Sequence, residues 1–197
     1  MMEIILNNVT KSFGSNEVIK NFNFLFEKKS YGITGQNGSG KSTLLKLIGN
    51  LILPSKGDIK YNFISKKDTL KHIFFCAPYQ DIISELTIKE FLLFHIKFRK
   101  LRFNTTELLN IFKLEKYIDT KIENLSSGTI QKIKLMITFY SESDFILLDE
   151  PTTNLDDEGK KIYFKLMDQF SGEKGIIVAT NDKKDILLDK KDIINLT

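Results

Sequence analysis

Two kinds of apolar run divide the chain, and the first kind predicts antiparallel strands. Over residues 2–30, short apolar stretches such as Ile4-Ile5-Leu6 and Phe22 to Phe26 are separated by polar and turn residues. Phe13-Gly14-Ser15-Asn16 is the turn candidate between two such stretches. Short runs bounded by turn residues are typical of antiparallel strands. A further strand is expected at Ile59-Lys60-Tyr61.

The second kind of apolar run is continuous and predicts buried parallel strands. Phe145 to Leu148 and Ile176 to Ala179 contain only apolar residues. Continuous runs of this length suit the centre of a parallel sheet, where both faces are covered. A helix expected between them, at Asp157 to Gln169, would complete a strand–helix–strand crossover. Tyr31 to Thr34 and His72 to Ala77 are further strand candidates.

A helical pattern occupies the middle of the chain, from about Thr87 to Tyr117. Large side chains cluster there at helical spacing, with lysine and glutamate between them. The clustered positions are Phe91, Leu92, Phe94, His95 and Phe98, followed by Leu108, Leu109 and Phe112. This region therefore predicts amphipathic helices.

Composition and charge narrow the class of protein. The 197 residues fit one domain with a sizeable core, and 42% hydrophobic with 27% charged residues is ordinary for a soluble globular protein. The net charge of +4 comes from scattered lysines, which favours a solvated surface over a nucleic-acid or membrane patch. The N-terminus does not resemble a signal peptide, and no apolar stretch approaches the length that crosses a bilayer. We therefore expect a cytosolic protein.

The cysteine and histidine residues do not suggest a metal site. A single cysteine, Cys76, excludes an intramolecular disulfide and is expected to be a small buried hydrophobe within an apolar run. His72 and His95 are isolated from other ligand residues in the sequence. Because clusters of ligands mark metal sites, we expect both histidines to be structural.

Residues Gly35 to Thr43 have the spacing of a phosphate-binding loop, with four residues between Gly35 and Gly40-Lys41-Ser42. The glycines let successive backbone N–H groups point into one concavity that holds an anion. Lys41 can reach the β- and γ-phosphates of a nucleotide, and the Ser42 hydroxyl can ligate Mg²⁺. A Gly/Ser/Lys stretch can also be merely a flexible turn. The strand expected before the loop and the helix expected at Thr43 to Asn50 favour the nucleotide site, because the helix dipole points at the phosphates.

Two acidic residues, Asp149 and Glu150, directly follow the apolar run Phe145 to Leu148. An aspartate at the end of a buried strand beside a phosphate loop is suited to hold Mg²⁺ or its waters. Glu150 would then face the γ-phosphate and act as the base for an attacking water. The alternative is that both acids simply begin a loop, which Pro151 would allow.

The order of these motifs resembles the nucleotide-binding subunit of ATP-binding-cassette (ABC) transporters over essentially the whole chain. Leu125-Ser126-Ser127-Gly128-Thr129 is similar to the family's signature motif, which usually reads Leu-Ser-Gly-Gly-Gln. Pro151-Thr152-Thr153-Asn154-Leu155-Asp156 is close to its D-loop, and Phe145 to Glu150 resembles its second nucleotide motif with the catalytic glutamate. Phe13 stands where the family has an aromatic residue that stacks on adenine.

The resemblance implies an α/β fold, a P-loop NTPase of ABC type. It consists of a mostly parallel central sheet, an N-terminal antiparallel β subdomain and an inserted α-helical subdomain. We expect a single ABC ATPase domain over residues 1–197, with the helical subdomain at approximately 81–140. The cofactors implied are ATP and Mg²⁺, with Ser42, Asp149 and Gln80 toward the metal. Glu150, Lys41 and Asn181 are the implied catalytic residues. The implied nucleotide contacts are Phe13, Gly35, Asn37, Gly38, Ser39, Gly40, Lys41, Ser42, Thr43, Ser126 and Gly128.

Three positions depart from the family pattern. Ser127 replaces the first signature glycine and adds a hydroxyl and a Cβ near the incoming phosphate. Asn181 stands where the family has a switch histidine; its amide can donate a hydrogen bond but cannot carry a proton at neutral pH. We therefore expect hydrolysis that is intact but slow. Gln80 is the glutamine available for the Q-loop, which senses Mg²⁺ in the family, although the usual position falls nearer Pro78. It can equally be a solvated loop residue.

The function implied is ATP hydrolysis that powers a membrane transporter, and the compact chain resembles small exporter subunits. The family mechanism is a head-to-tail dimer in which each ATP lies between the phosphate loop of one copy and the signature of the other. We expect a homodimer, or a pair with a second ABC subunit, held at the inner face of the cell membrane by separate transmembrane permease subunits. Nucleic acid is not an expected partner. The alternatives are a soluble ABC ATPase in cofactor assembly or nucleic-acid work, and a nucleotide-gated module that barely hydrolyses.

Overall fold

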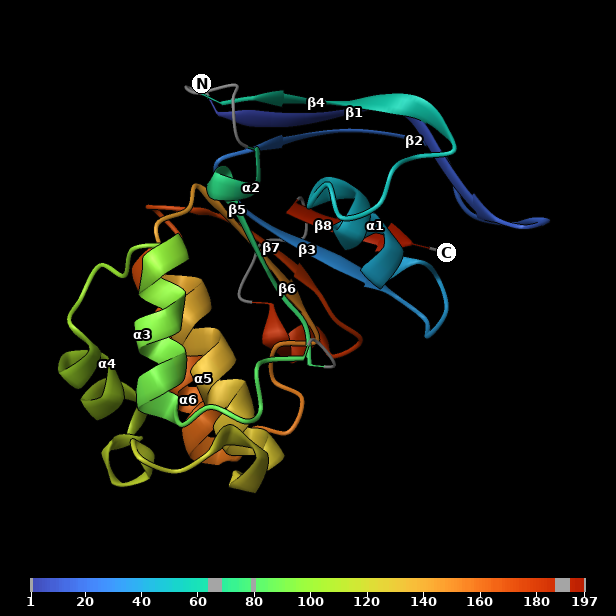
Figure 1. Cartoon of the computed structure of the whole chain (residues 1–197). Helices are drawn as coiled ribbons and strands as arrows, with labels where there is room; N and C mark the ends of the chain where they lie inside the picture. Colours follow the sequence, from blue (N-terminus) through green and yellow to red (C-terminus); the bar gives the residue numbers. More distant parts are fainter. Residues whose placement is uncertain (1, 64–68, 79–80, 187–191, 197) are drawn as a thin grey trace.

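The computed structural model describes residues 2–63, 69–78, 81–186 and 192–196 of the protein. Within these ranges the strands form an antiparallel sheet with the order β2-β1-β4 and a second sheet with the order β5-β6-β7-β3-β8. Figure 1 shows the antiparallel sheet above the second sheet, with α3 to α6 below. The strands are β1 (Glu3–Phe13), β2 (Asn16–Glu27), β3 (Ser30–Gly35), β4 (Lys56–Asn62), β5 (Ile73–Cys76), β6 (Phe145–Asp149), β7 (Gly175–Ala179) and β8 (Ile193–Leu196).

The N-terminal sheet confirms the antiparallel strands predicted over residues 2–30. Ile4 in β1 lies opposite Phe26 of β2 on one side and Tyr61 of β4 on the other. The side chain of Ile4 is buried, and so are those of Leu6 and Phe26. Strand β4 is longer than the predicted triplet, because its pairing with β1 already begins at Lys56.

The five-stranded sheet pairs all of its neighbours in parallel. Its two central apolar strands, β6 and β7, are buried at every position, which confirms the prediction of strands covered on both faces. The edge strand β5 begins at Ile73, one residue later than predicted, since His72 ends a short helix, α2 (Thr69–His72). In a parallel sheet all the carboxyl ends meet at one edge, so the segments that follow β3, β6 and β7 lie together.

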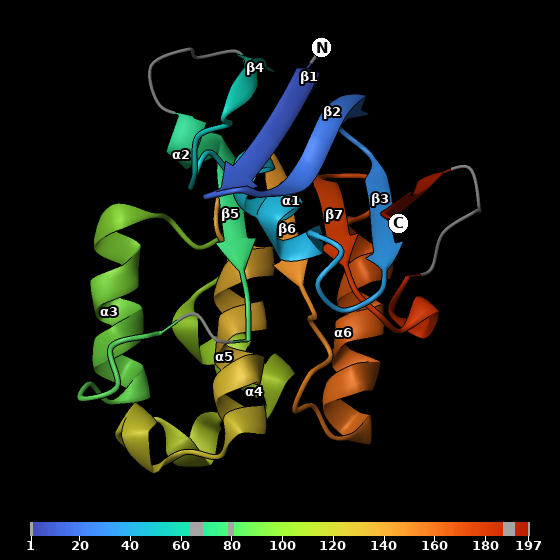
Figure 2. The same ribbon diagram turned by 90° about the vertical axis from the view of Figure 1, so that its right-hand side faces the viewer.

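Helices cover both faces of the parallel sheet. On one face α1 (Lys41–Ile48) lies between this sheet and the antiparallel sheet, and its leucine side chains are fully buried in a core shared by both. On the other face α5 (Ser127–Tyr140) and α6 (Asp157–Phe170) form a second core with Ile146, Leu148 and Val178. Figure 2 shows α5 and α6 side by side beneath the strands.

Helices α3 (Ile88–Phe98) and α4 (Thr105–Phe112) occupy the region where the sequence predicts amphipathic helices. A reciprocal capping box fixes the start of α3, because the Thr87 hydroxyl accepts the N–H of Glu90 and the Glu90 carboxylate accepts the N–H of Thr87. In the part of the chain that the structure describes, short 3-10 turns lie at Glu115–Tyr117, Ile122–Asn124 and Lys183–Asp185. Among the described residues, no helix combines the length and apolar character needed to span a bilayer.

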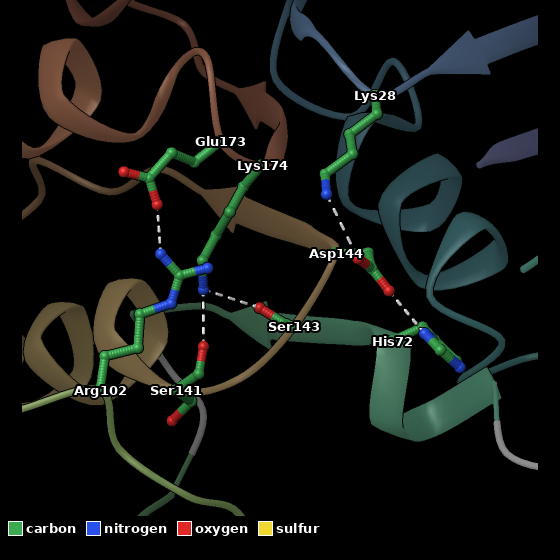
Figure 3. A network of polar contacts seen from close by, with 8 residues as sticks. All are labelled: Lys28, His72, Arg102, Ser141, Ser143, Asp144, Glu173 and Lys174. Carbon is green, nitrogen blue, oxygen red and sulfur yellow. Dashed lines mark hydrogen bonds and ion pairs between the residues drawn. The ribbon is translucent and has the colours of Figure 1, made fainter. Parts of the chain in front are cut away.

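A polar network lies at the opposite edge of the parallel sheet, where β5, β6 and β7 begin (Figure 3). Lys174, the residue before β7, is fully buried and donates to the Ser141 carbonyl at 2.6 Å and to the Ser143 hydroxyl at 3.0 Å. Asp144, the residue before β6, pairs with Nδ1 of His72 at 2.5 Å and with Lys28 at 3.3 Å. These contacts give His72 a structural role, as expected from the sequence, and they tie the starts of three strands together.

Candidate functional site

The loop between β3 and α1 has the backbone shape that the phosphate-binding motif requires. Gly40 takes a left-handed conformation with φ of 96°, and a Cβ there would lie 2.9 Å from side-chain atoms of Val18 and Ile19. Glycine is therefore required on both conformational and steric grounds. Because Gly40 ends the turn, α1 begins at Lys41, two residues earlier than predicted. The amino end of α1 thus faces the space that the loop encloses, as an anion site requires.

Lys41 is held inside this loop by three oxygen atoms. Its ammonium donates to the carbonyls of Gly35 and Gln36 at 3.0 Å each and to Oδ1 of Asn181 at 2.5 Å. The amide nitrogen of Asn181 donates in turn to Oδ1 of Asn37. The side chain of Asn181 therefore bridges the phosphate-loop lysine and the tip of the loop. A phosphate that binds Lys41 has to compete with this amide.

Asp149 has the features of a divalent-cation ligand. It ends the buried strand β6, and its Oδ1 atom is buried without a hydrogen-bond partner among the described residues. Burial raises the pKa of this carboxyl, while a hydrogen bond from Ser42 and the charges of Lys46 and Lys41 lower it. An orphaned carboxylate oxygen beside a serine hydroxyl is the oxygen-rich donor set that Mg²⁺ prefers. The residues present thus fit the ion that the sequence predicts.

Glu150 is held in a strained backbone conformation next to Asp149. Its φ of 44° lies in the left-handed region, and its N–H donates to the Ala179 carbonyl at 2.8 Å. One carboxylate oxygen accepts the N–H of Asn181 at 3.2 Å, and the other lies 3.2 Å from the hydroxyl of Thr180. Burial raises the pKa of Glu150, and the Thr180 hydrogen bond and the charge of Lys41 lower it. A partly buried carboxylate of this kind is a suitable general base.

A cleft of about 410 Å³ brings together most of the predicted site residues. Phe13, at the end of β1, is 54% exposed at its margin, where a flat ring could stack on it. The lining residues are Phe13, Val18, Asn37, Gly38, Gly40, Lys41, Ser42, Thr43 and Glu150. Gly35, Ser39 and Asn181 line an adjoining hollow, which shares Asn37 and Gly38 with this cleft. Gln80 lies outside the described residues.

The predicted signature segment begins α5. Ser126 is its N-cap, because the serine hydroxyl accepts the N–H of Thr129 at 3.2 Å, and the first turn carries no acidic residue. Gly128 faces the D-loop, where a Cβ would lie 2.6 Å from the Asn154 carbonyl oxygen. Ser127 and Asn154 line a hollow of about 480 Å³ that is distinct from the phosphate-loop cleft. The roles of these residues stay predictions.

Two polar residues around the site are not identified by the sequence reasoning. Asp185 is buried behind Glu150 and accepts hydrogen bonds from two threonines. Lys134 in α5 donates to the backbone carbonyls of Ala77 at 3.3 Å and Pro78 at 2.6 Å, and burial lowers its pKa. A lysine among apolar residues of α5 is the one available signal for Lys134, whereas nothing in the polar run that ends at Asp185 marks this carboxylate as buried.

Comparisons with known proteins agree with this geometry. The family model described as "ABC transporter" matches residues 19–153. The zinc import ATP-binding protein ZnuC of Wigglesworthia glossinidia brevipalpis is 33% identical, over 99% of this chain and 84% of that protein. The cytochrome c biogenesis ATP-binding export protein CcmA of Legionella pneumophila is 34% identical, over 81% of this chain and 82% of that protein.

Among solved structures, the ATP-binding cassette MJ0796, as a dimer in a post-hydrolysis state bound to ADP and Pi, superposes with a TM-score of 0.78. It is 28% identical and the match covers 98% of this chain and 94% of that one. The fold, the phosphate loop and these likenesses agree with one another. The chain belongs to the ABC transporter family of ATP-binding proteins, and it is an ATP hydrolase of the ABC type.

Proposed function

We propose that this protein is the ATP-hydrolysing subunit of a membrane transporter and that it works as a head-to-tail pair of cassettes. In this arrangement one ATP lies between the phosphate loop of one copy and the start of α5 in the other. The second copy is the same chain or a related ABC subunit. The relatives named as import and export ATP-binding proteins, and the dimeric state of MJ0796, support this proposal.

The observation that carries the proposal is that the two halves of the site are separate within one chain. No residue of the segment Ser126 to Thr129 lines the phosphate-loop cleft of the described structure. Yet this segment is suited to bind an anion, because Ser126 is exposed and the first turn of α5 has no negative charge. A second copy of the chain is the simplest source of a signature segment that faces this cleft. A twofold arrangement completes two equivalent sites at once.

The chemistry proposed is in-line hydrolysis of ATP. Lys41 binds the terminal phosphates, and Glu150 orients a water against the γ-phosphorus. As the water oxygen bonds to phosphorus, the bond to the ADP oxygen breaks and the water proton passes to Glu150. Ser42 and Asp149 are the residues that would hold Mg²⁺, which neutralises phosphate charge when bound.

A hollow beside the edge strand is the proposed docking place of a transmembrane partner. It has a volume of about 760 Å³ and lies between β5, α3 and the segment after α1. Phe74, His95 and Phe98 contribute to its lining, and Phe98 is 73% exposed. Burial lowers the pKa of His95 to about 4, which keeps this side chain uncharged at neutral pH. Exposed aromatic side chains around a hollow are typical of protein interfaces.

We further propose that the partner is a separate permease, that the subunit lies at the cytoplasmic face of the membrane, and that the system is a small exporter. The likeness to the CcmA export protein supports export, and the likeness to the zinc import protein ZnuC makes an importer the alternative. Isolation from detergent-solubilised membranes should recover the protein with a polytopic subunit. Phe98→Lys is expected to lose this subunit with little change in the thermal midpoint, because Phe98 is 73% exposed and a cation is favourable in the last turn of α3. Recovery without any membrane protein would contradict the proposal and favour a soluble ABC ATPase.

Glu150→Gln tests the hydrolysis site directly. We expect phosphate release to fall by about a hundredfold or more, while ATP binding and ATP-dependent pairing in size-exclusion chromatography persist. Glu27→Gln, the same carboxylate-to-amide change at a partly exposed position at the end of β2, is the matched control. An ATP-loaded Glu150→Gln protein that stays monomeric would exclude the paired site. No phosphate release from the intact protein with its partner would favour a nucleotide-gated module instead.

A further inference from the structure

Asp185 is a buried carboxylate behind the hydrolysis site. It ends the 3-10 turn Lys183–Asp185 that follows β7, and only 4% of its surface is exposed. None of the ion pairs among the described residues includes it. A buried carboxylate without a counter-ion is costly unless hydrogen bonds satisfy it. The groups that donate hydrogen bonds to the Asp185 carboxylate therefore indicate its role.

Both donors come from the two loops that carry proposed catalytic residues. The Thr152 hydroxyl lies 2.9 Å from each carboxylate oxygen of Asp185, and the Thr180 hydroxyl lies 2.9 Å from Oδ2. Thr152 is two residues beyond Glu150, and Thr180 immediately precedes Asn181. One carboxylate thus joins the loop after β6 to the loop after β7.

The Thr180 hydroxyl has one proton and two carboxylates within reach. Oδ2 of Asp185 lies at 2.9 Å and Oε2 of Glu150 at 3.2 Å, while the Thr180 oxygen itself accepts the N–H of Asp182 at 3.0 Å. As the nearer acceptor, Asp185 takes the larger share of this proton. The lone pairs of Glu150 Oε2 then remain available for a water molecule.

The loop held by Asp185 also contacts the start of α5. The Gln131 side chain donates to the Pro151 carbonyl at 2.9 Å, and Gly128 packs against the Asn154 carbonyl. On the other side, the Tyr163 hydroxyl of α6 donates to the Asp185 carbonyl at 3.0 Å and fixes the turn to the core. Asp185 therefore connects a rigid helix to the loop that separates Glu150 from the signature segment.

We propose that Asp185 is a positioning residue for hydrolysis, which holds the loops after β6 and β7 in register so that Glu150 presents a free carboxylate oxygen to water. This inference rests on the proposed role of Glu150. It concerns the geometry of the loop, and it assigns no contact between Asp185 and the nucleotide.

The test is Asp185→Asn, which keeps the size of the side chain but leaves one oxygen acceptor for two hydroxyls. We expect kcat to fall by about tenfold or more, because a small misplacement of a catalytic group is enough for such a loss. The KM for ATP and the affinity for ATP should stay within about threefold of the native values, since the phosphate loop is untouched. In hydrogen–deuterium exchange of the nucleotide-free protein, the segment 150–156 should exchange faster.

Thr152→Val and Thr152→Ser provide a matched pair that avoids a change in the buried charge. Valine removes the hydroxyl at nearly constant volume and should lower kcat, whereas serine keeps the hydroxyl and should restore it to within about threefold. Asp182→Asn is the control in the same turn, because asparagine caps as well as aspartate. If Asp185→Asn does not fold, the Thr152 pair decides alone.

The outcome against the proposal is a kcat within about twofold of native for both Asp185→Asn and Thr152→Val, with unchanged exchange in 150–156. A loss that Thr152→Ser shares equally with Thr152→Val also overturns it. The role of Glu150 is tested separately: if Glu150→Gln retains turnover, the proposed hydrolysis site fails. If Glu150→Gln is inactive while Asp185→Asn is fully active, only the inference about Asp185 fails.

Discussion

Lys174 makes the stability of this protein depend on pH, and Lys174→Met is the substitution that tests it. The side chain is fully buried before β7 and donates to the Ser141 carbonyl and the Ser143 hydroxyl (Figure 3). Burial, together with the charges of Arg102 and Arg99, lowers the pKa of Lys174 from 10.5 to about 7. A neutral amine has two protons, and these two acceptors satisfy both.

The sign and size follow from proton linkage. Between pH 7 and pH 9 the unfolded chain keeps the lysine proton while the folded protein loses it, so stability rises with pH. Each pH unit is worth about 1.4 kcal/mol when the two states differ by one proton. Because the lysine of the folded protein is only half protonated at pH 7, the unfolded chain binds about one half proton more than the folded protein at pH 7 and nearly one proton more at pH 9. The native protein should therefore gain about 2 kcal/mol more than Lys174→Met over this interval.

Urea denaturation at several pH values measures this difference, because the free energy of unfolding extrapolates linearly to water. The comparison uses the slope against pH, so the change in packing and the loss of two hydrogen bonds cancel. Lys28→Met is the matched control, since Lys28 belongs to the same network but is 34% exposed. Parallel curves for the native protein and Lys174→Met would refute the argument, and so would a native curve that falls with rising pH.

Three further predictions concern the nucleotide site. Gly128→Ala should destabilise the protein by about 1–3 kcal/mol and slow hydrolysis, because the new Cβ would lie 2.6 Å from the Asn154 carbonyl oxygen. The control is Gly172→Ala, which should leave the thermal midpoint unchanged because the new Cβ meets open space. Asn181→His should raise turnover, because histidine can carry a proton; unchanged turnover would show that the side chain at this position makes no contact in the reaction. Asp149→Asn should raise the Mg²⁺ concentration needed for half-maximal hydrolysis by about tenfold or more, and an unshifted Mg²⁺ titration would exclude Asp149 as a ligand.

Much of the fold could be predicted because burial on a regular element leaves a period in the sequence. The apolar runs of β6 and β7 are continuous because both faces of these strands are buried. The runs of β1 and β2 are short and interrupted because these strands are only partly buried. The phosphate loop could be predicted for a different reason. Its glycines serve backbone geometry, which depends on residue type at fixed spacing and little on the rest of the protein.

Lys174 and Asp185 could not be predicted, because each lies in a polar segment that looks like an exposed turn. Gly172-Glu173-Lys174-Gly175 carries no apolar period, yet the strand that follows draws Lys174 into the core. Asp185 is buried because the turn after β7 folds back on Tyr163 of α6. Both placements result from contacts between segments far apart in the chain. The contact between Asn181 and Lys41 could not be predicted for the same reason, since the two residues lie far apart in the chain.

The attachment of Lys134 in α5 to the segment after β5 has a consequence for how this protein tolerates substitution. Its two acceptors are main-chain oxygens of positions 77 and 78, which every amino acid supplies. Exchanging Ala77 or Pro78 therefore leaves the attachment in place, while shortening Lys134 severs it. Strand β5 also packs directly against α5, so Lys134 adds a polar attachment to an apolar contact, and one substitution at position 134 removes both hydrogen bonds while the packing stays.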